Sequence, residues 1–227
     1  MHDDDTRPIM ASKWWHDGLS ATGLSWLQDT SYSQIDHDLL FAFVERWHEE
    51  TSSFHLSFGE MTVTLDDMSC LLHLPIDGML LSHETISRND MVDMMMRYLG
   101  SSAGDALGGV TETRGAHARF NYLKKILKER LQLQLVLDNK CGMEEDVQRL
   151  RDQALCIYLL YLVGITLFTD KSANYVDVVY MRYFRDLDIV FDFSWGVACL
   201  SYLYRELNHV AHWSCSQLSE YLSLLHV

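Results

Sequence analysis

An uninterrupted run of mostly apolar residues, Ala154 to Phe168, constrains the fold of this chain more than any other feature of its sequence. The run is shorter than the roughly 20 residues that a membrane-spanning helix needs, so no membrane span is predicted. A helix that is apolar on every side must be surrounded by other elements. We therefore expect this run to form a central buried helix.

The length of the chain favours one domain. It has 227 residues, of which 48% are hydrophobic and only two are proline. Such a chain buries roughly 70–75% of the surface that its unfolded form exposes, enough for one core without metals or disulfides. No stretch has the composition of a linker. We predict a mainly α, single globular domain of about 8–10 helices over residues 36–227, preceded by a partly helical N-terminal segment, residues 1–35.

One segment has the pattern of β-strands instead. Apolar and polar residues alternate over residues 54–58 and again over residues 61–65, with Gly59-Glu60 between the two runs. Two alternating runs joined by a Gly-X pair are typical of a β-hairpin with a type II′ turn. We expect one small β-hairpin near residues 54–65, with His55 on the face opposite the apolar residues.

Helical spacing marks the elements on either side of the hairpin. A stripe of apolar residues that includes Trp47 predicts a helix from Asp36 to about residue 50. After the hairpin, Asp66 or Asp67 is expected to cap a short helix that Pro75 stops.

Later segments give three further predictions. Asp77-Gly78 predicts a turn, and the four glycines between Gly100 and Gly109 predict a flexible loop. Apolar residues at helical spacing over 176–187 predict one continuous helix.

The charge of the chain disfavours direct binding to nucleic acid. Its 18 basic and 32 acidic residues give a formal net charge of -14, whereas a polyanion needs a basic face. The basic cluster Lys124, Lys125, Lys128 and Arg130 is interpreted as a solvated helix face. None of the five cysteines forms a CxxC pair, and four lie in apolar or helix-patterned stretches, which favours reduced, buried thiols in the cytosol or nucleus over a disulfide framework.

Acidic residues are the first candidates for a catalytic metal site. Asp66 and Asp67, together with Asp186, Asp188 and Asp192, have the residue type of a two-metal nuclease site, which needs carboxylates that converge on the ions. The sequence shows no such convergence, and the first pair stands where a helix cap belongs. Capping is therefore the preferred interpretation.

Other candidate sites are weaker. His209, His212 and Cys215 could share a helix face and bind a metal, but no fourth ligand is evident. Lys171 could form a Schiff base with a cofactor, although Asp170-Lys171-Ser172 is better interpreted as a polar corner between helices. No nucleophile elbow or phosphate-binding glycine loop occurs. We predict no catalytic residue, no metal ligand and no cofactor.

Aromatic residues in the helical segments are interpreted as core. Trp47, Trp195, Tyr202 and Tyr204 lie at helical spacing, and Arg205 is expected to form a paired charge at the edge of the core.

Several ordered motifs resemble one family. The segments that carry the resemblance are Val44-Glu45-Arg46-Trp47, Phe54-His55-Leu56, Gly59 to Asp67, Leu74 to Gly78, Tyr161 to Gly164, Asp170-Lys171-Ser172, Phe193 to Gly196 and Leu203-Tyr204-Arg205. In this order they resemble the plant mobile domain, which includes maintenance-of-meristems proteins, domains of transposable elements and fusions to phosphatase 7. The motif positions taken as structural or interaction residues are Trp47, Phe54, His55, Gly59, Glu60, Asp66, Asp67, Asp77, Gly78, Asp170, Lys171, Ser172, Trp195, Gly196, Tyr204 and Arg205.

The resemblance implies a role in binding other proteins more than a role in catalysis. It implies a non-catalytic interaction or scaffold domain in the nucleus, acting in transposon silencing and regulation of gene expression. The implied partner is a phosphatase-7-like protein, with other plant mobile domain proteins as further partners. A metal-dependent nuclease or a transposase-derived enzyme remnant stays open as the alternative.

The chain also departs from the family pattern. Ser57-Phe58 stands where the family often has Pro, and His73 stands where it often has Gly. The family's last block usually continues past the equivalent of Leu225, so the resemblance implies a chain that is either truncated at its C-terminus or naturally short there.

Overall fold

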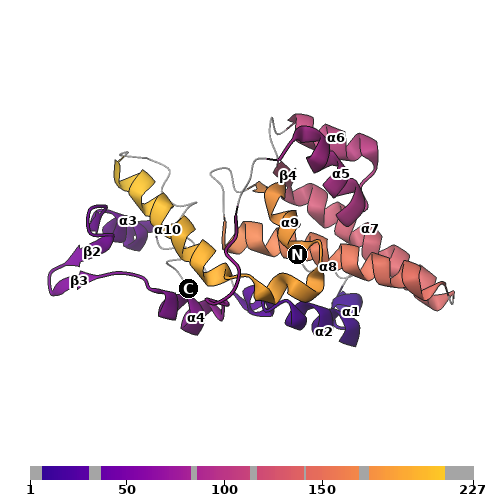
Figure 1. The fold of residues 1–227 in the computed structure, drawn as a ribbon, viewed down its shortest axis with the longest axis horizontal. Helices are drawn as coiled ribbons and strands as arrows, with labels where there is room; N and C mark the ends of the chain where they lie inside the picture. Colours follow the sequence, from indigo (N-terminus) through magenta and orange to yellow (C-terminus); the bar gives the residue numbers. More distant parts are fainter. Residues whose placement is uncertain are drawn as a thin grey trace.

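A pair of long helices forms the centre of the molecule. The computed structural model describes residues 7–30, 37–82, 86–112, 117–140, 142–168 and 174–212 (Figure 1). Helix α7, Phe120–Asn139, packs along helix α8, Glu144–Thr166. Every residue of α8 from Ala154 to Gly164 is buried, which confirms the predicted central helix. None of the described helices is long and apolar enough to cross a bilayer.

The N-terminal helices complete one side of this core. They are α1, Arg7–Met10, α2, Lys13–Ala21, and the 3-10 helix η1, Ser25–Asp29. The Trp15 ring of α2 packs edge-on against Tyr158 of α8, with ring centroids 5.1 Å apart. The segment before residue 36 therefore shares the core of the main domain.

Helices α5, Arg88–Tyr98, and α6, Ala103–Glu112, pack together above α7 (Figure 1). The predicted loop over Gly100–Gly109 is wrong, because α6 occupies most of it. Ser102 caps this helix by accepting a hydrogen bond from the Asp105 N–H at 3.1 Å, and Ala106 is fully buried. The cap and the burial outweigh the low helix propensity of glycine.

The predicted helix over 176–187 is also wrong, since this stretch is divided into four short elements. They are strand β5, Tyr175–Asp177, 3-10 helix η2, Val178–Tyr180, helix α9, Met181–Phe184, and 3-10 helix η3, Leu187–Asp192. Strand β5 pairs with β4, His117–Arg119, in an antiparallel sheet that the sequence pattern did not reveal. Asp177 and Asp186 each cap the following 3-10 helix, which explains the interruptions.

A three-stranded sheet lies beside the last described helix, α10, Trp195–His212 (Figure 1). Its strands are β1, Trp47–His48, β2, Ser53–Leu56, and β3, Gly59–Met61, between helices α3, His37–Val44, and α4, Leu65–Leu72. The mainly α fold class is confirmed, with ten α-helices among the described residues.

Two predicted boundaries around this sheet need correction. Leu56 pairs with Gly59, so the turn lies at Ser57-Phe58 and not at Gly59-Glu60. Helix α3 ends at Val44, and Trp47 lies on a strand, because its backbone pairs with Phe54. Alternation and helical spacing coincide over short stretches, so the pattern alone did not fix either boundary.

Candidate functional site

An aromatic cluster holds the three-stranded sheet against α10. The Trp47 ring packs against Phe54 at 4.9 Å and against Tyr204 at 5.3 Å, and its Nε1–H donates to Asn208 Oδ1 at 2.6 Å. The Tyr204 hydroxyl in turn donates to the Val63 carbonyl at 2.6 Å. The motif residues Trp47, Phe54 and Tyr204 therefore join two distant parts of the chain.

Arg205 forms the predicted paired charge at the edge of the core. Its Nε and one terminal nitrogen donate to the buried Glu206 carboxylate at 3.0 and 2.9 Å, while the Arg205 side chain is 68% exposed. The guanidinium also lies over the Tyr202 ring at 4.7 Å. Trp195 is fully buried, as the sequence predicted.

The outer face of the sheet carries His55 and Glu60. His55 Nε2 lies 3.5 Å from Glu60 Oε1, and its ring stacks on His48 with centroids 3.7 Å apart. Ser53 also donates to Glu60 at 3.2 Å. Gly59 has a φ of +143° and nothing near its missing side chain, so it allows the strand to leave the turn.

Asp66 and Asp67 lie in the first turn of α4, but neither is its N-cap. Thr64 caps the helix, and Asp67 completes a capping box by accepting from the Thr64 backbone N–H at 2.7 Å. Two hydrogen bonds lower the pKa of Asp67: the bond with the Thr64 hydroxyl has the larger effect, and the bond from the Thr64 backbone N–H adds to it. Asp67 therefore has a structural role, and Asp66 lies in a favourable position for a negative charge at the helix N-terminus.

Two motifs that are far apart in sequence meet directly. At the predicted turn, Gly78 has a φ of +110°, and a side chain there would collide with the Asp192 carbonyl oxygen. The Met79 N–H donates to the same carbonyl at 2.8 Å, and the Ser194 N–H donates back to the Met79 carbonyl at 2.9 Å. Asp77-Gly78 therefore positions the chain against the segment before α10.

The start of α10 completes this junction. The Gly196 N–H donates to the Pro75 carbonyl at 2.8 Å, and a side chain at Gly196 would lie 2.8 Å from Ile76 Cγ2. Trp195 Nε1 donates to the Val190 carbonyl at 2.9 Å. The motif residues here fix the packing of backbone segments.

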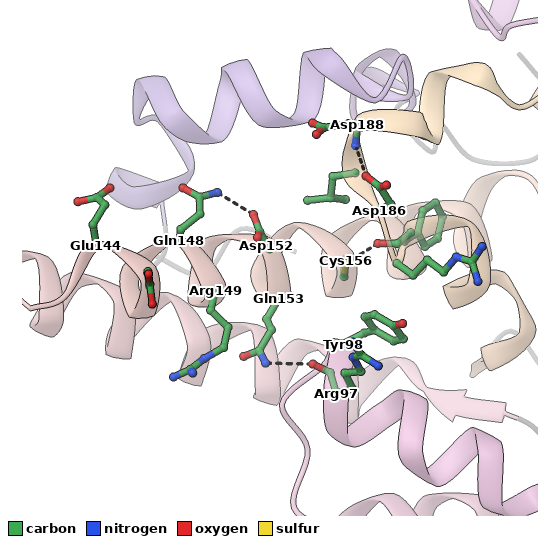
Figure 2. Close-up of a pocket in the computed structure, with 14 residues that line it drawn as sticks. Arg97, Tyr98, Glu144, Gln148, Arg149, Asp152, Gln153, Cys156, Asp186 and Asp188 are labelled. Carbon is green, nitrogen blue, oxygen red and sulfur yellow. Dashed lines mark hydrogen bonds between the residues drawn. The ribbon is translucent and has the colours of Figure 1, made fainter.

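An open cleft of about 890 Å³ lies between α8 and the start of η3 (Figure 2). Asp152, Asp186 and Asp188 line it together with Arg97 and Arg149. Burial raises the pKa of Asp152, and the charge of Asp188 raises it further. The structure thus brings Asp186 and Asp188 to one cleft.

The other carboxylates of the nuclease hypothesis lie elsewhere. Asp192 belongs to the junction with Met79, and Asp66 and Asp67 belong to α4. Among the residues that the structure describes, no three His, Cys, Asp or Glu side chains are arranged to hold a metal ion.

Some candidates fall outside the described part of the chain. Asp170-Lys171-Ser172, Cys215 and the side chain of His212 are among them, so the polar corner and the His-Cys metal site stay predictions. Cys156 and Cys199 are buried, and burial raises the pKa of each thiol to about 12. Cys70 is exposed.

An exposed apolar surface is not evident from the sequence. Trp26 on η1, Met79 after α4 and Phe191 on η3 are 55%, 48% and 56% exposed, although they come from three distant segments. The Trp26 ring packs against His73 with centroids 4.5 Å apart, and the Phe191 ring lies against Gly23. Helical spacing does not reveal such a surface, because its members lie in turns and 3-10 helices. We call Trp26, His73, Met79 and Phe191 the Trp26 surface.

The fold and these contacts define a mainly α-helical domain whose sequence motifs join distant segments. The chain belongs to the plant mobile domain family, whose model matches residues 23–227. No solved structure matches the chain significantly.

Relatives from Arabidopsis thaliana show the same domain inside longer proteins. Protein MAIN-LIKE 2 is 36% identical over 91% of this chain and 28% of its own length, and Protein MAINTENANCE OF MERISTEMS is 29% identical over 91% and 40%. Serine/threonine-protein phosphatase 7 long form homolog is 30% identical over 99% of this chain and 15% of its own length. The chain spans less than half of each of these relatives.

Proposed function

We propose that this chain is a non-catalytic interaction or scaffold domain that binds a phosphatase-7-like protein. The proposal includes a nuclear location and a role in transposon silencing and regulation of gene expression, with other plant mobile domain proteins as further partners. The observation that carries it is the recurrence of one domain, over at least 91% of this chain, in relatives of which it forms between 15% and 40%. A unit that recurs in proteins of such different length behaves as a module.

The roles of the motif residues support a binding domain over an enzyme. Tyr204 holds the segment before α4, Asp67 completes a helix cap, and Gly78 allows close backbone contact. Such residues act on folding and on the shape of the surface. The formal charge of -14 also favours protein partners over nucleic acid.

Binding to the partner can be measured with purified proteins. The chain should form a stable complex with a phosphatase-7-like protein in size-exclusion chromatography and in calorimetry, and an unrelated serine/threonine phosphatase should not bind. Crosslinking with mass spectrometry would then identify the contact surface. Absence of a complex in both assays would refute the assigned partner.

The non-catalytic role and the location need separate tests. The chain should not hydrolyse DNA with Mg²⁺ or Mn²⁺; hydrolysis that Asp66→Ala abolishes would establish the nuclease alternative. A fluorescent fusion of the full-length protein should accumulate in plant nuclei, and exclusion from the nucleus would contradict the proposed role.

A further inference from the structure

The Trp26 surface is assembled from three segments that the fold holds in place. His73 follows α4 and packs against Trp26, while Phe191 of η3 lies against Gly23, three residues before Trp26. The Met79 N–H donates to the carbonyl of Asp192, the residue next to Phe191. These contacts place the three segments side by side, joined by one backbone hydrogen bond and by the packing of the Trp26 and Phe191 rings.

These side chains lie outside the buried core. On η1 the buried residue is Leu27, and on η3 it is Val190, while Trp26 and Phe191 remain more than half exposed. Leu80, beside Met79, is 70% exposed as well. Several large apolar residues exposed on adjacent segments mark a binding site more often than isolated ones do.

Acidic residues border this surface. Asp29 lies three residues after Trp26, and positions three apart are eclipsed on a 3-10 helix. Asp192 follows Phe191, and Asp77 lies two residues before Met79; all three aspartates are exposed. The segments that carry the surface, residues 22–30, 71–80 and 189–193, contain these three aspartates and no lysine or arginine.

Exposed apolar side chains with neighbouring aspartates favour one kind of binding partner. A second copy of the chain would bring acidic rim against acidic rim, and DNA or an anionic membrane would be repelled in the same way. A partner segment with apolar anchors and flanking lysines or arginines complements both features of the surface.

We propose that the Trp26 surface binds a basic amphipathic segment of a partner protein, with apolar side chains against Trp26 and Phe191 and basic side chains beside Asp29, Asp77 and Asp192. This assignment rests on the proposed function, since it names the surface through which the domain binds its partner.

Synthetic peptides provide a direct test with the intact chain. The probe is a labelled helical peptide with leucine and phenylalanine on one face and lysines on its flanks. One control peptide has glutamate in place of each lysine, and another has serine in place of each apolar anchor. Fluorescence anisotropy should show saturable binding of the probe and no binding of either control peptide. The affinity for the probe should be lower at high salt. Equal binding of the glutamate peptide would overturn the proposal.

Variants locate the binding on the chain. Phe191→Ser and Trp26→Ser should each weaken probe binding by about tenfold or more, as expected for a buried aromatic anchor. Phe58→Ser is the matched control, because Phe58 is 80% exposed on the hairpin turn. The control should bind like the original chain, and a loss equal to that of the Trp26 variant would refute the assignment.

The charge of the rim can be tested without altering any apolar side chain. The triple variant Asp29→Asn, Asp77→Asn, Asp192→Asn should fold normally by circular dichroism, bind the probe less tightly and show a smaller salt dependence. Unchanged affinity in this folded variant would overturn the proposal. So would dimerisation of the original chain, in sedimentation, that is lost in Trp26→Ser.

Binding of the phosphatase-7-like protein distinguishes a failure of the surface assignment from a failure of the proposed function. If that protein binds the original chain and the Trp26→Ser, Phe191→Ser double variant equally well, the surface assignment fails and the proposed function stands. If the probe binds at the Trp26 surface but the phosphatase-7-like protein does not bind, the assigned partner fails and the surface assignment stands.

Discussion

Replacement of Gly78 by alanine tests whether the junction between the two motifs holds the fold together. Gly78 has a φ of +110°, a conformation that residues with a side chain rarely adopt, and its missing Cβ faces the Asp192 carbonyl. The neighbouring backbone bonds, Met79 to Asp192 and Ser194 to Met79, are 2.8 and 2.9 Å long. An added methyl group must therefore displace one of the two segments.

The structure sets the size of the effect. Backbone strain at a positive φ costs about 1–2 kcal/mol for a residue with a side chain. Displacing the segment that carries Asp192 and Ser194 weakens both of these hydrogen bonds, each worth about 1 kcal/mol. We expect Gly78→Ala to lower the free energy of unfolding by roughly 3–4 kcal/mol, a large fraction of the 5–15 kcal/mol typical of a domain.

Urea unfolding measured by tryptophan fluorescence and circular dichroism will report this loss. The midpoint should fall while the m-value stays constant. Gly108→Ala is the matched control, because Gly108 lies in α6 with nothing near its missing side chain, and the change should stabilise the chain by about 0.5–1 kcal/mol. A Gly78→Ala protein as stable as the control would refute the role of the junction.

Three further substitutions or reactions have expected outcomes. Tyr204→Phe should destabilise the chain by about 1–2 kcal/mol and raise hydrogen exchange in the three-stranded sheet, because it leaves a carbonyl without its donor; unchanged exchange would contradict this. His73 has a φ of +52°, so His73→Gly should be about 1 kcal/mol more stable than His73→Ala in urea unfolding, both variants having lost the Trp26 contact. Because burial raises the pKa of Cys156 to about 12, its thiol should stay protonated and resist alkylation from pH 7 to 9, whereas exposed Cys70 reacts; mass spectrometry of alkylated peptides distinguishes the two sites.

Periodicity predicted the parts of the fold that are governed by burial. The run from Ala154 to Phe168 identified α8 because its apolar character extends around the whole helix. The pattern failed where a local cap decides the structure. Ser102 starts α6 in a glycine-rich stretch, and Asp177 and Asp186 interrupt what helical spacing presents as one helix.

The candidate site was predictable only in part. The motif residues Trp47, Gly78, Trp195 and Tyr204 were identified, but their mutual contacts depend on tertiary packing that spacing does not encode. The Trp26 surface was missed because exposure is a property of the assembled segments, and nothing in the sequence places Phe191 beside Gly23.

The glycines of the junction and the aromatic residues of the Trp26 surface have separate roles. Gly78 and Gly196 determine where the backbone of the junction runs, so their replacement should lower stability first and binding as a consequence. Trp26 and Phe191 stand on that backbone with more than half of their surface exposed, so their replacement should lower binding while the midpoint of unfolding changes little. The proposed interaction role predicts this separation between residues that shape the fold and residues that contact a partner.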